Sequence, residues 1–299
     1  MNTLKNSKFY QSIRLLRLHQ WFKNILIIAP LFAANIIPKF QIINDYLVSF
    51  IALGLCVSSV YIVNDIADYK TDKLHPLKCK RPIASGKISI KESFFLAIIL
   101  LTIGLTLSLQ INKTFFVHIL IYLIIANSYS FYLKQLFIVD CLILSFFYTF
   151  RIILGSVIIN MQISIWLFIF SFSWFLSLAL IKRYSELLLF KGEKKEKIIG
   201  RTYFVKDISK IRFFGLFSGY LSILILTFYI YSENASLYFN QPSMIWLLIL
   251  ILLIWINFMW IKASKNEIND DPILYALKNK VSIILGIFFL IISILAKWF

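Results

Sequence analysis

The sequence predicts an all-α, polytopic membrane protein with about nine transmembrane helices. Of its 299 residues, 60% are hydrophobic and 15% are charged, and the mean hydropathy is +0.82. A soluble protein of this length cannot bury so much apolar surface. Apolar runs of about 20 residues, the length that crosses a bilayer as a helix, recur along the chain. No break in composition marks a second domain, so residues 1–299 are predicted to form one transmembrane domain.

Each apolar run is predicted to be one span. The start of the chain, Met1 to Gln11, is polar and lacks an apolar core, so no signal peptide is predicted there. The first span carries Pro30, which membrane helices tolerate where neighbours satisfy the freed backbone groups. In chain order the predicted spans are Gln20–Pro38, Tyr46–Val63, Ser93–Ile111, Phe115–Tyr132, Leu136–Ile159, Ile163–Ile181, Phe213–Tyr231, Ser243–Ile261 and Val281–Ala296.

Basic residues predict the orientation of the chain. With the N-terminus in the cytoplasm, all but four of the 31 Lys and Arg residues fall on the inner side. Lys39, Lys113 and Lys297 lie outside, and Arg151 lies within a span. The pattern predicts a multi-pass protein of the cell (inner) membrane. Its two long inner loops follow the second and sixth spans, a spacing that suggests a four-helix unit used twice, with one helix added.

The net charge of +17 also bears on the partners. In a soluble domain it would suggest nucleic acid. Here the cations lie between spans, so anionic lipid heads and phosphorylated substrates are the expected partners, and nucleic acid is not. The cysteines Cys56, Cys79 and Cys141 form no CxxC motif, so neither a disulfide framework nor a thiolate metal site is predicted.

An acidic cluster follows the second span. If that helix continues, about 100° per residue places Asp65, Asp68 and Asp72 within one arc of about 60°. Three carboxylates on one face repel each other unless a cation lies among them. Oxygen ligands without His or Cys favour Mg²⁺ over zinc. The alternative is a solvated acidic loop start that neighbouring lysines neutralise.

Cations follow this acidic cluster within a dozen residues. Acids and bases this close together suggest a site for a metal-bridged polyanion. Lys80 and Arg81, directly before Pro82, are interpreted as phosphate ligands; the alternative is ordinary charge of an inner loop. For His75, donation to a phosphate and capping of the turn before Pro76 remain equally open.

Further polar stretches accompany the acidic motif: His19–Asn24, Lys80–Gly86, Tyr129–Ser130, Lys182–Leu187 and Asp271–Leu277, with Lys134, Asp140 and Arg151. Together with Asn64-Asp65-x-x-Asp68-x-x-x-Asp72, they resemble the UbiA superfamily of intramembrane prenyltransferases. The resemblance covers nearly the whole chain and is closer to the branch that includes decaprenyl-phosphate phosphoribosyltransferases. It implies a helical bundle with a central cavity open to the cytoplasmic face, Mg²⁺ on the three aspartates, and substrate contacts from Asn64 and Lys134.

One departure distinguishes the two branches. Prenyltransferases of this superfamily usually carry a second acidic motif after the sixth helix, but here the chain reads Lys182-Arg183-Tyr184-Ser185-Glu186. An isoprenyl diphosphate would lose half of its acidic, metal-bearing clamp. A substrate with more phosphate charge, such as phosphoribosyl pyrophosphate (PRPP), would gain from the two cations. The alternative is a simple i,i+4 pair between Lys182 and Glu186.

Other candidates lie near the same membrane face. Arg151 at mid-span costs about 3 kcal/mol to insert, so it is expected to bind a phosphate or to form a buried pair with Asp140 or a backbone carbonyl. Asp140 is interpreted as a base or as a residue that holds another. Tyr129 and Tyr184 are candidates for hydrogen bonds to a phosphate or a ribose, and interfacial placement is the alternative. Lys23 and Asn24 enter the first span at the same membrane face, and snorkelling is the alternative for Lys23.

The leading hypothesis is therefore a Mg²⁺-dependent membrane enzyme that moves 5-phosphoribose from PRPP to a polyprenyl phosphate at a cytoplasmic site. One alternative is a prenyltransferase that acts on an aromatic acceptor with the same metal. Another is a transporter or a lipid-binding scaffold, although the charges cluster at one face and form no path across the bilayer. The sequence leaves the oligomeric state open, a homo-oligomer included.

Overall fold

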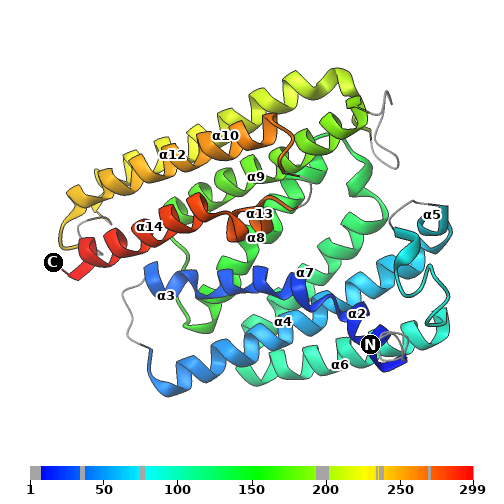
Figure 1. The fold of residues 1–299 in the computed structure, drawn as a ribbon. Helices are drawn as coiled ribbons and strands as arrows, with labels where there is room; N and C mark the ends of the chain where they lie inside the picture. Colours follow the sequence, from blue (N-terminus) through cyan, green and yellow to red (C-terminus); the bar gives the residue numbers. More distant parts are fainter. Residues whose placement is uncertain are drawn as a thin grey trace. The chain divides into compact units, whose positions relative to one another are not determined.

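The computed structural model of this protein describes residues 8–33, 38–74, 78–192, 202–233, 235, 239–268 and 271–298. Its regular elements are α-helices and 3₁₀-helices (Figure 1). Among the described residues, eight helices are long and apolar enough to cross a membrane, which confirms the all-α, polytopic prediction. They are α4 (Phe40–Ala67), α6 (Ile90–Ile111), α7 (Lys113–Phe131), α8 (Val139–Ile158), α9 (Ile165–Gly192), α10 (Ile208–Ile230), α12 (Ile245–Ser264) and α14 (Lys280–Trp298).

The N-terminal segment differs from the continuous α-helix predicted for Gln20–Pro38. After α2 (Lys8–Leu16), the chain forms the 3₁₀-helix η1 (Leu18–Ile28) and the short helix α3 (Ala29–Ala33). Pro30 falls in the first turn of α3, where its missing N–H costs no hydrogen bond. Because a 3₁₀-helix rises about 2.0 Å per residue, η1 alone covers roughly 22 Å, most of the hydrocarbon thickness.

The chain forms two compact units. The first takes the described residues within Met1–Phe32, Ile36–Phe131 and Arg151–Gln162, and the second takes those within Ala33–Asn35, Tyr132–Phe150 and Ile163–Phe299. The main boundary between the two units follows Phe131. It lies at the end of the fourth predicted span, where the spacing of the long loops suggested that the first four-helix unit ends. A boundary also falls inside α8, between Phe150 and Arg151.

In the first unit, α4 packs along α6, and α7 also contacts both (Figure 1). The close approach needs small residues, because a Cβ on Gly104 would lie 2.6 Å from the Cys56 sulfur. Near the C-terminal end of α4 and the N-terminal part of α6, one hydrophobic cluster joins α2, α4, α6 and the loop before α6: Leu15, Ile62, Ile83, Ile88, Ala97 and Leu100. The buried Ile83 and Ile88 anchor that loop, which is why the charged residues beside them have a defined place.

Gly155 lets α8 lie directly against η1. A Cβ at this position would come 1.9 Å from the Ile27 carbonyl oxygen, and the Gly155 carbonyl accepts a 2.8 Å hydrogen bond from the Tyr46 hydroxyl. Small residues allow such backbone contacts between membrane helices.

Gly155→Ala is therefore expected to destabilise the protein by about 3 kcal/mol, because backbone must move to accept the methyl group. Thermal unfolding of the purified protein in detergent measures the effect. Gly286→Ala in α14 is the matched control, since a Cβ there meets nothing within 4 Å. Equal unfolding temperatures of the two variants would contradict the assigned contact.

In the second unit, α9 and α10 lie side by side, with α12 against both (Figure 1). Polar groups inside this packing satisfy each other. Ser177 donates to the Gly215 carbonyl at 2.6 Å, and Trp260 Nε1 donates to the Ser177 hydroxyl at 3.1 Å. Such internal pairing is required where no water is available.

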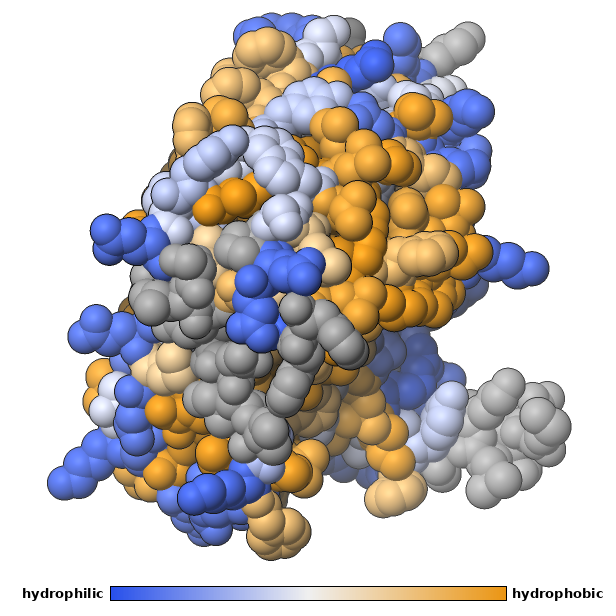
Figure 2. All heavy atoms as spheres, turned by 90° about the vertical axis from the view of Figure 1, so that its left-hand side faces the viewer, coloured by the Kyte–Doolittle hydropathy of each residue, from blue (hydrophilic) through white to orange (hydrophobic). Residues whose placement is uncertain are grey.

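The spans expose apolar side chains widely. Figure 2 shows hydrophobic side chains over much of the face it presents. Contact of such a surface with lipid tails costs no free energy, whereas its contact with water is unfavourable. This surface supports an integral, multi-pass membrane protein. Examples of large side chains that are more than half exposed come from both units: Phe94, Phe95, Ile124, Phe213, Leu250 and Phe288.

Candidate active site

The acidic motif lies at the end of α4 and the start of the next helix. α4 ends at Ala67, Asp68 is its C-cap, and Asp72 belongs to the short helix α5 (Tyr69–Leu74). The single continuous helix assumed for the three aspartates is therefore wrong. Asp65 and Asp72 are buried, with 4% and 3% of their surface exposed. Burial of two carboxylates requires nearby cations.

Arg81 supplies one of these cations. Its Nη1 donates to Asp65 Oδ1 at 3.0 Å and to Asp72 Oδ2 at 2.6 Å. Arg81 follows the 3₁₀-turn η2 (Lys78–Lys80), and a tight turn closes behind it at Gly86, whose φ of 73° suits glycine. The predicted neighbourhood of Arg81 and the aspartates is therefore present in the first unit, with the guanidinium paired to two of them.

Arg17 supplies the second cation, a role that was not predicted from the sequence. Its Nη2 donates to Asp65 Oδ1 at 2.5 Å, and its guanidinium carbon lies 4.9 Å from the centre of the Tyr61 ring. Arg17 precedes the polar stretch His19–Asn24 by two residues. That proximity was the available signal, although a basic residue near a span is common at the inner face.

These residues fit a magnesium ion in part. Within the described ranges, no group of three or more His, Cys, Asp or Glu side chains is arranged to hold a metal, so the set Asp65, Asp68 and Asp72 is not preformed. However, one Arg81 nitrogen contacts both Asp65 and Asp72, so a cation placed there would meet oxygens of both. Magnesium commonly takes one or two carboxylates and completes its shell with water and substrate phosphates.

A further cation of the first unit, Arg151, is buried. Its Nε donates to Asn24 Oδ1 at 3.1 Å and its Nη2 donates to the Tyr122 hydroxyl at 3.0 Å. All three residues are buried. The sequence suggested a buried pair between Arg151 and Asp140 as one alternative. Asp140 accepts a hydrogen bond from Arg183. Tyr122 carried no sequence signal, because its partner is distant in the chain.

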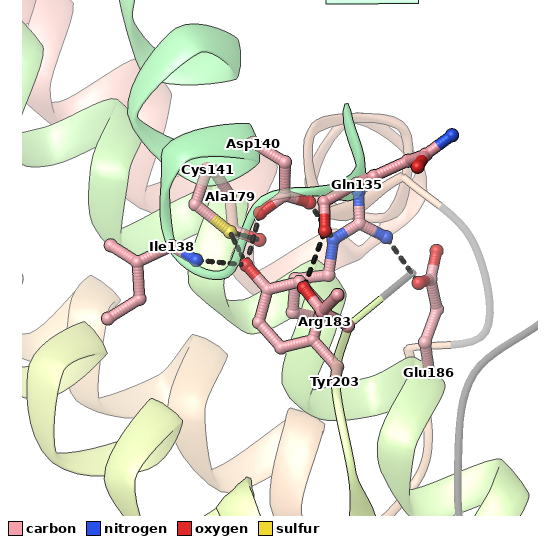
Figure 3. A network of polar contacts seen from close by, with 9 residues as sticks. Gln135, Ile138, Asp140, Cys141, Ala179, Arg183, Glu186 and Tyr203 are labelled. Carbon is pink, nitrogen blue, oxygen red and sulfur yellow. Dashed lines mark hydrogen bonds and ion pairs between the residues drawn. The ribbon is translucent and has the colours of Figure 1, made fainter. Parts of the chain in front are cut away.

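The second unit holds its own charged network, shown in Figure 3. Arg183 Nε donates to Asp140 Oδ2 at 2.6 Å, and Arg183 Nη1 donates to Glu186 Oε2. Arg183 and Asp140 are fully buried, whereas the Glu186 side chain is 31% exposed. Because α9 runs to Gly192, Lys182 and Glu186 lie on this helix, and their predicted place in a loop after the span is wrong.

Tyr203 completes this network. Its hydroxyl donates to Asp140 Oδ1 and accepts from the Ile138 backbone N–H at 2.9 Å (Figure 3). Ile138 has a φ of 65°, which is unusual for a β-branched residue and is held here by the surrounding contacts. Burial raises the pKa of Tyr203 well above its usual value, so the hydroxyl stays protonated and remains a donor.

The other predicted site residues have varied surroundings. Tyr184 is buried and packs edge to face against Trp260, with ring centres 5.5 Å apart. The Lys23 ammonium lies 5.9 Å from the centre of the Phe22 ring. His75 lies outside the described residues. Four more residues are at least partly exposed on the first or second unit: Asn64, Lys80, Tyr129 and Lys134.

Two relatives are similar in sequence to this chain, one over most of its length and the other over more than half of it. The uncharacterized protein y4nM of Sinorhizobium fredii is 35% identical over 272 residues, 91% of this chain and 53% of the relative. The decaprenyl-phosphate phosphoribosyltransferase of Corynebacterium glutamicum is 32% identical over 181 residues, 59% of this chain and 54% of the relative. The chain thus spans about half the length of these two relatives.

A solved structure has the same fold. The UbiA homolog from Archaeoglobus fulgidus bound to GPP and Mg²⁺ aligns with a TM-score of 0.70 at 18% identity, covering 95% of this chain and 96% of that one. The model of the UbiA prenyltransferase family matches residues 25–279, most of the chain, which includes the aspartate motif and seven of the eight spans, from α4 to α12. The protein therefore belongs to the UbiA prenyltransferase family.

Proposed function

We propose that this protein transfers 5-phosphoribose from PRPP to a polyprenyl phosphate and releases pyrophosphate. The observation that carries the proposal is the pair of cations, Lys182 and Arg183, where family prenyltransferases usually have an acid. A relative named decaprenyl-phosphate phosphoribosyltransferase, 32% identical over 181 residues, supports it. Because Arg183 is paired with Asp140 and Glu186, we assign the phosphate contact in this stretch to Lys182 and a positioning role to Arg183.

The first unit would bind the leaving group. Asp65 and Asp72, with Asp68 beside them, are the proposed magnesium ligands, and Asn64 would support them. A bound Mg²⁺ would neutralise the pyrophosphate charge as it develops. Arg81 and Lys80 would add positive charge at the same place. This arrangement suits a donor whose pyrophosphate leaves from an anomeric carbon.

The bond changes follow from the two substrates. The bond between the ribose C1 and the pyrophosphate oxygen breaks, the ribose ring passes through an oxocarbenium-like state, and a bond forms between C1 and an oxygen of the lipid phosphate. The attacking phosphate is already anionic, so no general base is needed. A water-soluble donor and a membrane-bound acceptor explain why such an enzyme is embedded in the membrane.

A reconstitution assay tests this function. Purified protein with Mg²⁺, undecaprenyl phosphate and PRPP labelled in the ribose is expected to release pyrophosphate and to form a labelled lipid. An Asp65→Asn sample serves as the inactive control. PRPP that stays intact, with consumption of geranyl diphosphate and 4-hydroxybenzoate instead, would overturn the proposal.

That second outcome corresponds to the alternative function, prenyl transfer to an aromatic acceptor. The related fold was solved with GPP and Mg²⁺, which favours this candidate. The cation at Lys182, where an acid is usual, argues against this candidate, because a prenyl diphosphate carries less phosphate charge than PRPP.

Lys182→Gln is expected to raise the KM for PRPP about tenfold, the loss of one charge-assisted hydrogen bond. The expected effect on the KM for the lipid acceptor is small. Lys191→Gln, at the exposed end of the same helix, is the matched control. Steady-state kinetics with each substrate varied in turn gives the answer, and an unchanged KM for PRPP would remove Lys182 from the site.

A further inference from the structure

We propose that Arg17 is a positioning residue that sets the affinity of the acidic motif for a divalent cation. Its guanidinium and the cation would compete for the same oxygen of Asp65. The proposal rests on the function proposed above, in which Asp65 is a metal ligand. It adds a residue outside the acidic motif that controls how tightly the metal binds.

The competition follows from the contacts of Asp65 Oδ1. This oxygen accepts from Arg17 Nη2 at 2.5 Å and from Arg81 Nη1 at 3.0 Å. A carboxylate oxygen offers about two lone pairs, so both are used. The Asp65 side chain is only 4% exposed, so solvent screens these contacts little. A metal that coordinates Oδ1 must therefore displace one of the two guanidinium groups.

Arg17 is the donor that can be displaced with fewer consequences. Arg81 also donates to Asp72 Oδ2 at 2.6 Å, so its departure would leave two buried carboxylates without this donor. The side chains of Arg17 and Arg81 are 22% and 29% exposed, so both have a route toward solvent, and the second carboxylate contact of Arg81 is what distinguishes them. The two arginines therefore differ in role, although both contact the same oxygen.

The backbone at Arg17 directs its side chain toward Asp65. Arg17 adopts φ 49° and ψ 47° at the junction of α2 and η1, a left-handed conformation that few non-glycine residues adopt. The two residues before Arg17 are fixed: Leu15 is buried in the core, and the Leu16 carbonyl accepts from the Ser58 hydroxyl at 2.6 Å. Strain retained by such contacts is frequent at functional sites.

Tyr61 supports the same placement. It lies one helical turn before Asp65 on α4, so its ring and the carboxylate face the same side of the helix. The Arg17 guanidinium carbon is 4.9 Å from the ring centre, within the range of a cation–π contact. A displaced guanidinium could therefore keep its contact with the ring, which would hold Arg17 near the site.

Binding of Mn²⁺, measured by electron paramagnetic resonance on the purified full chain in detergent, tests the proposal. Arg17→Asn removes the competing charge, and asparagine tolerates the left-handed backbone. We expect the Mn²⁺ dissociation constant to fall about tenfold. Arg17→Lys keeps a charge but loses the planar fork, so an intermediate constant is expected.

Arg14→Gln is the matched control. Arg14 lies one turn earlier and donates to the Gln11 side chain and the Lys80 carbonyl, which are uncharged. Its loss should leave the Mn²⁺ affinity unchanged. Wild-type affinity or weaker binding in Arg17→Asn, or in Arg17→Lys if the first variant does not fold, overturns the role of Arg17. Absence of Mn²⁺ binding in the wild type, or equal binding in Asp65→Asn, refutes the metal site and with it the proposed function.

Discussion

Asp65→Asn is expected to lower kcat/KM for the proposed transfer roughly 10²–10³-fold, the range seen when one electrostatic contact to a transition state is removed. Two effects add. The variant removes a proposed magnesium ligand, and it leaves Arg17 and Arg81 without the carboxylate that accepts from both. Initial rates at saturating and at limiting Mg²⁺ separate the two effects, because excess metal compensates only for weakened binding.

Asp45→Asn is the control for this prediction. Asp45 lies on the same helix, α4, where it accepts from Gln41 at 3.1 Å, and it is about 30 Å along the helix from Asp65. The substitution is chemically identical, so the two variants share any general effect on expression. Activity of Asp65→Asn within threefold of Asp45→Asn would exclude Asp65 from the reaction.

Arg183→Met is expected to destabilise the protein by about 3–5 kcal/mol, because removal of one partner leaves a buried charge uncompensated. Asp140 would lose its 2.6 Å donor while fully buried, and Glu186 would lose the same cation. Thermal unfolding of the purified protein in detergent, followed by size-exclusion chromatography, measures the loss.

Lys182→Met is the matched control, one position earlier on α9 and only partly buried. We expect it to change the free energy of unfolding by less than about 1 kcal/mol. Asp140→Asn is expected to destabilise nearly as much as Arg183→Met, and the double variant less than the sum, since both substitutions act on one contact. Additive effects in the double variant would show that the two residues stabilise the fold independently.

The two charged networks differ in how much of each could be predicted from the sequence. Asp65, Asp72 and Arg81 were predicted to lie together because they are close in the chain and have complementary charges. The pair considered from the sequence was Lys182 with Glu186, and Arg183 was expected to face substrate, whereas Glu186 accepts from Arg183. The buried carboxylate that neutralises it, Asp140, lies 43 residues away on another helix. Nothing local in the sequence indicates which cation a distant acid will select.

The N-terminal segment shows a different limit. Apolar residues after Gln20 predicted a span, and the segment does form helical structure, but as η1 and α3. The choice of a 3₁₀-helix depends on what packs against it. Gly155 allows the Ile27 carbonyl to approach α8, and Trp21 lies over Gly54 while donating to Ser58 at 3.0 Å. These contacts come from residues far along the chain, so propensity alone could not reveal them.

The sequence by itself determined the class of this protein: a multi-pass helical membrane protein of the UbiA family, with an acidic motif after the second predicted span. Hydropathy is a local property and the motif residues are close in the chain, so both features can be recognised from the sequence alone. Only the tertiary structure decided the partners of the charges, with Arg17 on Asp65 across 48 residues and Tyr203 on Asp140 across 63. The physical reason is that a buried charge must be satisfied by whichever group the packing brings within hydrogen-bond distance.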